Sequence, residues 1–102
     1  MGKTFILKNW HLQCIGCRVV AFGCVQGHPT FYTGQRIHTS YITEKHTLED
    51  GTICIETYVG NSYLLMPKEQ NMKKELETKH SWVLLNQWLE KRKKNEKKRA
   101  LL

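Results

Sequence analysis

The chain has 102 residues, 40% of them hydrophobic, and a formal net charge of +7. A chain of this length builds one hydrophobic core, so we expect a single domain over residues 1–102. No apolar run approaches the ~18 residues that a membrane-spanning helix needs, and the first residues lack the apolar stretch of a secretory signal. The sequence therefore excludes a membrane span and predicts a cytoplasmic protein.

The positive charge is concentrated at the C-terminal end. Residues 91–99 carry seven basic and one acidic side chain, whereas the rest of the chain carries nine basic and eight acidic ones. The body is thus nearly neutral, and the positive field belongs to residues 91–102, here called the basic tail.

The first expected strand covers residues 4–12, where apolar and polar residues alternate in part. Regular alternation places Phe5, Leu7 and Asn9 on one side of this strand and Trp10 on the other. Residues 13–16 are expected to form a connection.

A second, central strand is predicted at residues 18–26, a β-branched and aromatic-rich run that is apolar on both faces. The Gly27-His28-Pro29 segment ends it, because proline has no amide donor and restricts the residue before it. Residues 27–35 are expected to form a long loop, and residues 36–48 to return as a strand.

Asp50-Gly51 has the composition of a two-residue hairpin turn with positive φ. Such a turn would place Lys45 opposite Glu56, an opposite-charge cross-strand pair.

Gly60-Asn61 is a second tight-turn signal, which would place Tyr63 opposite Tyr58. The middle of the chain is therefore predicted to be a meander of short antiparallel strands.

Pro67 is expected to end the sheet, because the residues after it favour helix and include no glycine or proline. The pattern has a weak point at residues 78–81, where Ser81 could cap a second segment, so a break near His80 stays open. The helix is expected to dock on the sheet through an apolar stripe made of Met72, Leu76, Val83, Leu84, Leu85 and Trp88.

Together these elements predict an α+β fold. Residues 1–66 would form a small antiparallel β-meander able to close toward a barrel, residues 67–90 a docking α-helix, and residues 91–102 its basic continuation. An exposed apolar helix face would favour a homo-oligomer.

The loop and strand between residues 27 and 40 concentrate groups that suit a phosphate-bearing ligand. Arginine supplies a bidentate fork for phosphate oxygens, histidine and serine supply single donors, an aromatic ring can stack on a base, and glycine permits close backbone approach. The alternative interpretation is a solvated strand face beside an ordinary loop. The predicted ligand-binding residues are Gly27, His28, Pro29, Phe31, Arg36, His38, Thr39 and Ser40.

Three segments carry a resemblance to a known group: Thr4-Phe5-Ile6-Leu7-Lys8-Asn9-Trp10-His11-Leu12, then Gly27-His28-Pro29-Thr30-Phe31 with Gly34-Gln35-Arg36-Ile37-His38-Thr39-Ser40, and finally Ser62-Tyr63-Leu64-Leu65. They resemble short uncharacterised proteins of bacteria and their phages, which share the pattern F-x-L-x-N-W-x-L, G-H-P-R-F-x-D-G-x-x-I-x-T-S-x-I and S-x-Y-x-L. The resemblance covers residues 4–66, with Thr30 and Thr33 standing where the group has Arg and Asp.

This resemblance implies a phage or prophage setting in a bacterial host. Small proteins of that setting neutralise host defences by sequestering a nucleotide signal or by blocking a nuclease. No enzymatic activity comes with the resemblance.

The four cysteines raise the question of a metal site. Cys14, Cys17, Cys24 and His28 have the residue types of a zinc site, but a continuous strand would separate Cys17 from Cys24 by about 23 Å at ~3.3 Å per residue. One zinc ion cannot bridge that distance, so we predict no metal and no cofactor. In the absence of an export signal, the thiols are expected to stay reduced.

Three binding functions remain as alternatives, and none is enzymatic. The first is sequestration of a phosphate-bearing nucleotide signal, the second is inhibition of a host defence complex by protein docking, and the third is nucleic-acid binding led by the basic tail. An enzyme with Cys24 as nucleophile and His28 or His38 as general base is the weakest hypothesis, because the sequence offers no third residue to orient the base.

Overall fold

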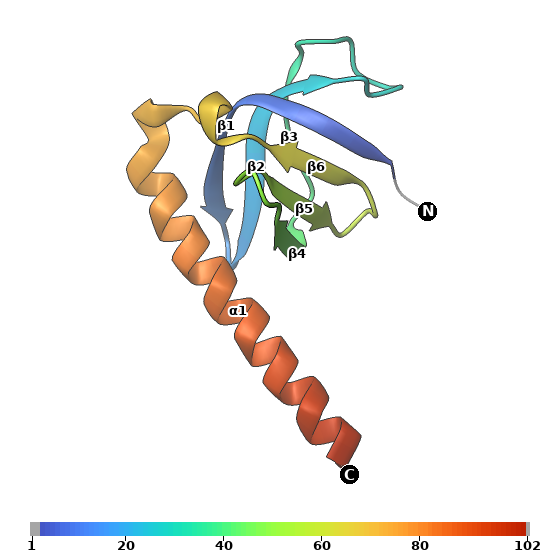
Figure 1. Cartoon of the computed structure of the whole chain (residues 1–102), viewed down its shortest axis with the longest axis vertical. Coiled ribbons are helices and arrows are strands. Elements are labelled where there is room, and N and C mark those ends of the chain that lie inside the picture. Colours follow the sequence, from blue (N-terminus) through green and yellow to red (C-terminus); the bar gives the residue numbers. More distant parts are fainter. Residues whose placement is uncertain (1–2, 102) are drawn as a thin grey trace.

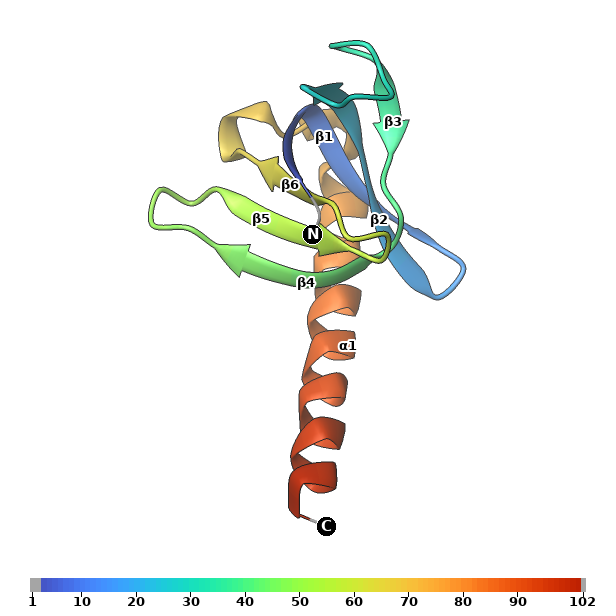
Figure 2. The same ribbon diagram turned by 90° about the vertical axis from the view of Figure 1, so that its right-hand side faces the viewer.

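The computed structural model describes residues 3–101, and it describes side chains for residues 3–94. Over this range it is an α+β structure, a six-stranded mixed sheet followed by one long helix (Figures 1 and 2). The elements in chain order are β1 (Thr4–Ile15), β2 (Arg18–Gln26), β3 (Arg36–His38), β4 (Ile42–Thr47), β5 (Ile53–Thr57), β6 (Ser62–Leu65), the 3-10 turns η1 (Pro67–Glu69) and η2 (Met72–Lys74), and the helix α1 (Glu75–Leu101).

The strand order in the sheet is β3-β2-β1-β6-β5-β4. All neighbouring strands pair antiparallel except β1 and β6, which are parallel. The expected α+β class and the β4-β5-β6 meander are confirmed. The predicted strand over residues 36–48 is wrong, because residues 39–41 divide it into β3 and β4 at opposite edges of the sheet. So short a link makes the sheet curl strongly, although it does not close into a barrel.

The core lies on the inner side of this curled sheet. Leu7, Val25, Ile55 and Leu65 come from four different strands and are fully buried there. Leu85 of α1 is 2% exposed and joins the same cluster, so the helix closes the core on the side that the sheet leaves open. Figures 1 and 2 show that the C-terminal part of α1 continues well past the sheet.

A β-bulge in β1 changes which side chains face the core. Lys8 pairs with Cys24 and His11 pairs with Phe22, so two residues, Asn9 and Trp10, stand opposite one. Asn9 has φ +52°, which is the left-handed conformation that asparagine tolerates. Trp10 is therefore 1% exposed in the core, and the expectation from regular alternation that it would face the other side is wrong.

Both central hairpins have three-residue loops. In the first, Leu48 N donates to Thr52 O at 2.8 Å, and Gly51 alone takes a positive φ of +87°. This is a turn closed by a glycine bulge, and it shifts the register by one residue from that of the predicted two-residue turn. Lys45 consequently lies opposite Ile55, so the predicted Lys45–Glu56 pair is wrong.

The second hairpin repeats this geometry. Thr57 N donates to Asn61 O at 3.0 Å, and Gly60 has φ +98°. Tyr63 lies opposite Ile55, not opposite Tyr58 as predicted.

The predicted docking stripe is confirmed only in part: Leu85 lies in the core, and Leu84 and Trp88 pack against it. Met72, Leu76 and Val83 of the predicted stripe are 60%, 83% and 54% exposed, whereas Thr78 and Ser81 are each 1% exposed. The predicted weak point is thus part of the buried face, and α1 runs through His80 without a break.

The reason lies in the free edge of β1 beyond its pairing with β6. Asn71 N donates to Trp10 O at 2.7 Å, and Thr78 Oγ1 accepts from Leu12 N at 3.1 Å. The backbone of Asn71, just before η2, and the hydroxyl of Thr78 on α1 therefore pair the backbone of a strand edge that would otherwise be buried without partners. Among the described residues, no helix is long and apolar enough to cross a membrane.

Candidate functional site

The eight predicted ligand-binding residues fall into three separate groups in the structure. Gly27, His28, Pro29 and Phe31 belong to the loop after β2, Arg36 and His38 project from the outer face of β3, and Thr39 and Ser40 lie in the link to β4. The three groups differ in which of their side-chain atoms remain available to a ligand.

The loop group is packed against the core. The His28 ring lies 4.6 Å from Phe5 and 4.7 Å from Phe31, measured between centroids, and its Nδ1 accepts from Thr30 N at 3.0 Å. Phe31 packs against the core cluster. These contacts hold the loop in place and leave little of either ring for a ligand. Gly27 has φ +79°, and both Gly27 and Pro29 are exposed.

The link group is committed to backbone hydrogen bonds. Thr39 is 3% exposed, and its Oγ1 accepts from Ala21 N at 3.1 Å and donates to Ser40 O at 2.7 Å. Ser40 Oγ accepts from Val59 N at 3.2 Å. Both hydroxyls therefore stabilise the crossing between the two sheet edges.

Arg36 and His38 lie on the outer face of the sheet together with residues that the sequence patterns did not single out. Across β1, β2 and β3, the register aligns Lys8, Cys24 and Arg36 in one row and His11, Phe22 and His38 in the next. We call these six residues the outer-face cluster. The β1 bulge builds it, because it turns His11 outward while turning Trp10 inward.

The second row is a stack of three aromatic rings, of which His11 is buried at 4% exposed. The rings of His11 and Phe22 are 5.0 Å apart and nearly parallel, with an interplanar angle of 5°, and the ring of His38 is 5.4 Å from Phe22. His38 is exposed and Phe22 is half-buried. Phe22 and His38 are therefore the rings on which a base of any identity could stack, and His11 supports Phe22 from below.

The guanidinium of Arg36 is held above this surface by two hydrogen bonds. Its Nη1 donates to Asn9 O at 3.3 Å, and its Nη2 lies 3.2 Å from His11 Nδ1. A guanidinium has five N–H donors and no acceptor, so His11 Nδ1 must accept, and three donors of Arg36 remain for a ligand. Arg36 is exposed and makes no described ion pair, so its charge is available.

The state of His11 supports this arrangement. Burial lowers the pKa of His11 below its ordinary value of 6.5, and the charge of Arg36 lowers it further, whereas the hydrogen bond to Gln13 acts in the opposite direction. Neutral His11 keeps the lone pair on Nδ1 that orients Arg36. The chemistry available at the outer-face cluster is therefore anion binding beside a stacking surface.

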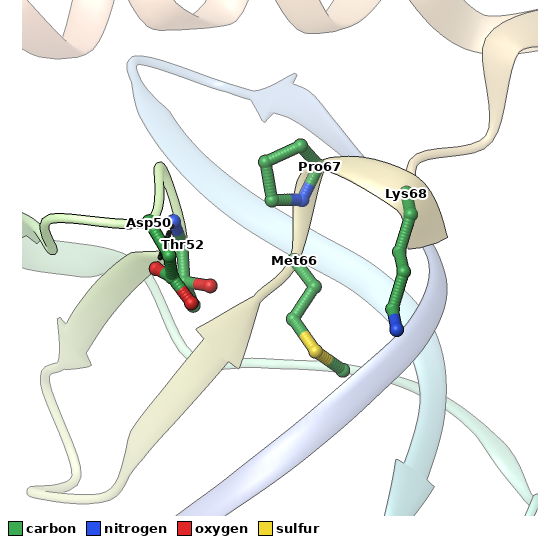
Figure 3. A pocket seen from close by; sticks show the side chains of 5 residues that line it. All are labelled: Asp50, Thr52, Met66, Pro67 and Lys68. Atoms are coloured by element: carbon green, nitrogen blue, oxygen red, sulfur yellow. Dashed lines mark hydrogen bonds between the residues drawn. The ribbon is translucent and has the colours of Figure 1, made fainter.

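A cavity of about 320 Å³ lies elsewhere, between the β4–β5 turn and the junction of β6 with η1 (Figure 3). Figure 3 shows Asp50 with Thr52 on one side of Met66 and Lys68 on the other. Its rim thus carries one anion and one cation, and the hydrogen bond from the Thr52 backbone amide lowers the pKa of Asp50, which favours its charged form. None of the predicted ligand-binding residues lines this cavity.

No group of three or more His, Cys, Asp or Glu side chains within the described part of the chain is arranged to hold a metal ion. Cys54 is half-buried, and burial, with the nearby charge of Glu56, raises the pKa of its thiol. Of the basic tail, residues 91–94 are exposed on α1, and the side chains from residue 95 onward lie outside the described residues.

Comparisons of this chain with protein-family models, with curated proteins and with solved structures found no match.

Proposed function

We propose that this protein binds a phosphate-bearing nucleotide or nucleic acid on the outer-face cluster and catalyses no reaction. The observation that carries the proposal is the exposed guanidinium of Arg36, oriented by Asn9 and His11 and lying beside the aromatic row of Phe22 and His38. A base would stack on the rings while its phosphate receives the remaining donors of Arg36. Lys8, in the same row as Arg36, would add a second positive charge.

The resemblance to short phage and bacterial proteins gives this binding a biological setting. In it, the protein acts in the cytoplasm of a bacterial host and sequesters a nucleotide signal of a defence system. Sequestration requires that the ligand be enclosed, whereas the outer-face cluster is open, so a second copy of the chain would cover the ligand.

The test is fluorescence anisotropy with a labelled single-stranded oligonucleotide of about ten nucleotides, a length within the range that small β-sheet domains cover. Arg36→Ala removes the oriented donors and should weaken binding by about 1.5–3 kcal/mol, since its hydrogen bonds to phosphate are charge-assisted. Phe22→Leu keeps an apolar side chain but removes the flat ring, and should cost about 1–3 kcal/mol.

Two variants serve as matched controls. Lys68→Ala removes one positive charge from the cavity of Figure 3, and Tyr32→Leu removes an aromatic ring that is 74% exposed in the loop after β2. Both should retain the affinity of the unmodified protein. If Lys68→Ala weakens binding as much as Arg36→Ala, the interaction is a general charge effect and the proposed site is wrong.

Inhibition of a host protein is a second candidate function, favoured by an exposed aromatic patch at the β5–β6 turn. Tyr58 and Val59 are 67% and 68% exposed, and Tyr58 stacks on Tyr41 with ring centroids 4.7 Å apart. Exposed tyrosines are enriched where proteins bind one another. Tyr58→Ala should abolish capture of a protein partner while leaving oligonucleotide binding intact, and the reverse outcome would remove this candidate.

A further inference from the structure

Arg18, at the start of β2, contacts two aromatic rings through its guanidinium. Its guanidinium carbon lies 4.8 Å from the centroid of Tyr41 and 5.0 Å from that of Trp88, so both rings contact it. Cation–π contacts of this kind fix the guanidinium without using its N–H donors, which point outward in its plane.

The donors of Arg18 have no partner among the described residues. The Arg18 side chain makes no hydrogen bond and no ion pair there, in contrast to Arg92, which also lies over Trp88 at 5.7 Å but donates to Thr43 O and pairs with Glu44 at 3.3 Å. A fixed guanidinium with free donors has the geometry that binds a phosphate in a bidentate manner. The exposed basic residues 91–94 of α1 make the electrostatic potential around it positive, which favours an anion.

Arg18 also belongs to the strand that carries Phe22 and Cys24 of the outer-face cluster. Phe22 and Cys24 alternate with the core residues of β2 and face the outer side, whereas Arg18, at the first position of the strand, has its guanidinium beside Trp88 of α1. Cys24 is the cross-strand neighbour of Arg36 and lies six residues after Arg18. Six residues of strand span at most about 20 Å, so this is the distance along β2 between Arg18 and the row of Arg36. One nucleotide stacked on Phe22 does not extend over that distance, whereas a strand of several nucleotides does.

We infer that Arg18, in contact with Tyr41 and Trp88, is a second phosphate-binding residue, and that the ligand is a single-stranded nucleic acid that follows β2 from Arg36 to its first residue, Arg18. This inference rests on the proposed function and narrows its ligand to a strand of several nucleotides. Because two aromatic rings already lie against the Arg18 guanidinium, its free N–H donors are what it offers to a phosphate.

The experiment measures the affinity of two labelled single strands, of about two and about eight nucleotides, for the unmodified protein, Arg18→Gln and Arg36→Ala. The unmodified protein should bind the longer strand at least about tenfold more tightly than the shorter one. Arg18→Gln should weaken binding of the longer strand by about tenfold and leave the shorter strand within about twofold. In Arg18→Gln, the slope of log K against log salt for the longer strand should be smaller in magnitude than in the unmodified protein by about 0.7, the value for one lost phosphate contact.

Arg18→Lys is the second variant, because it keeps a cation against both rings and loses only the fork. It should keep the thermal stability of the unmodified protein and weaken the longer strand by about threefold, less than Arg18→Gln does. Equal weakening of both strands, or an unchanged salt slope in Arg18→Gln, would mean that Arg18 only anchors α1, and would overturn the inference. Failure of the proposed function looks different: neither strand binds, or Arg36→Ala has no effect on either.

Discussion

Thr78 gives a quantitative test of how α1 is held to the sheet. Its Oγ1 accepts from Leu12 N at 3.1 Å, and both residues are buried, at 1% and 0% exposed. Leu12 lies on the part of β1 that extends past its pairing with β6, so this amide has no strand partner on that side. Thr78→Val preserves the volume of the side chain but leaves the amide unpaired, which should cost about 1–3 kcal/mol.

That loss is a large share of the roughly 5–15 kcal/mol that keeps a typical domain folded. For a chain of this size it should lower Tm by about 4–8 °C per kcal/mol. Urea denaturation followed by circular dichroism measures the change as a lower midpoint at unchanged m. Hydrogen exchange adds a local readout, because the Leu12 amide should lose more protection than other core amides.

Thr78→Ser is the control, because it keeps the hydroxyl and removes one methyl group. It should cost about 0.8 kcal/mol and keep the Leu12 amide protected. A Thr78→Val protein within about 0.5 kcal/mol of the original, with unchanged exchange at Leu12, would refute the role assigned to this hydrogen bond.

The remaining predictions concern pH, packing and backbone conformation. The folded pKa of His11 lies below its ordinary value of 6.5, so His11 stabilises the fold above about pH 6.5. This stabilisation is lost as pH falls through the lowered pKa, by at most about 1.4 kcal/mol per pH unit. The His11→Gln variant, measured by urea denaturation between pH 5 and 8, should lose this pH dependence. Gly23→Ala places a Cβ 3.1 Å from Lys8 O and 3.2 Å from Leu7 Cβ, opposite the bulge, and should cost about 1–3 kcal/mol in the same assay, whereas an unchanged midpoint would show that the bulge relaxes. Gly60→Ala meets no atom within 4 Å but has φ +98°, so thermal unfolding should show a loss of about 1 kcal/mol from backbone strain alone.

The α+β class and the limits of β2 follow from local composition, since β-branched runs, glycine turns and the helix-favouring residues after Pro67 act over a few positions. The hairpin registers do not, because Asp50-Gly51 and Gly60-Asn61 suit both two-residue turns and three-residue loops with a glycine bulge. A two-residue turn and a three-residue loop differ by one residue, and this difference is enough to change every cross-strand pair of the hairpin.

The outer-face cluster was only partly predictable. Arg36 and His38 were named from their alternation, but His11 and Phe22 were missed, because the β1 bulge and the pairing of β1 with β2 bring them there. One signal was present in the sequence. The large apolar residues lie at odd positions before Asn9 (Phe5 and Leu7) and at even positions after it (Trp10 and Leu12), and such a change of parity within a strand indicates a bulge.

The docking roles of Met72, Leu76 and Val83 were mispredicted for a related reason. An apolar stripe assumes that a helix packs only against apolar side chains, whereas Thr78 pairs a strand edge. Such a partner depends on where a distant strand ends, which local periodicity does not encode.

The most direct measurement of the central claim is an NMR titration of the ¹⁵N-labelled protein with a single-stranded oligonucleotide of about eight nucleotides. Binding at the outer-face cluster predicts that the largest shift changes fall on Lys8, His11, Phe22, Arg36 and His38, with the guanidinium resonances of Arg36 among them. Shifts confined to the cavity beside Lys68 or to the loop around His28, or no shifts at millimolar ligand, would contradict the claim.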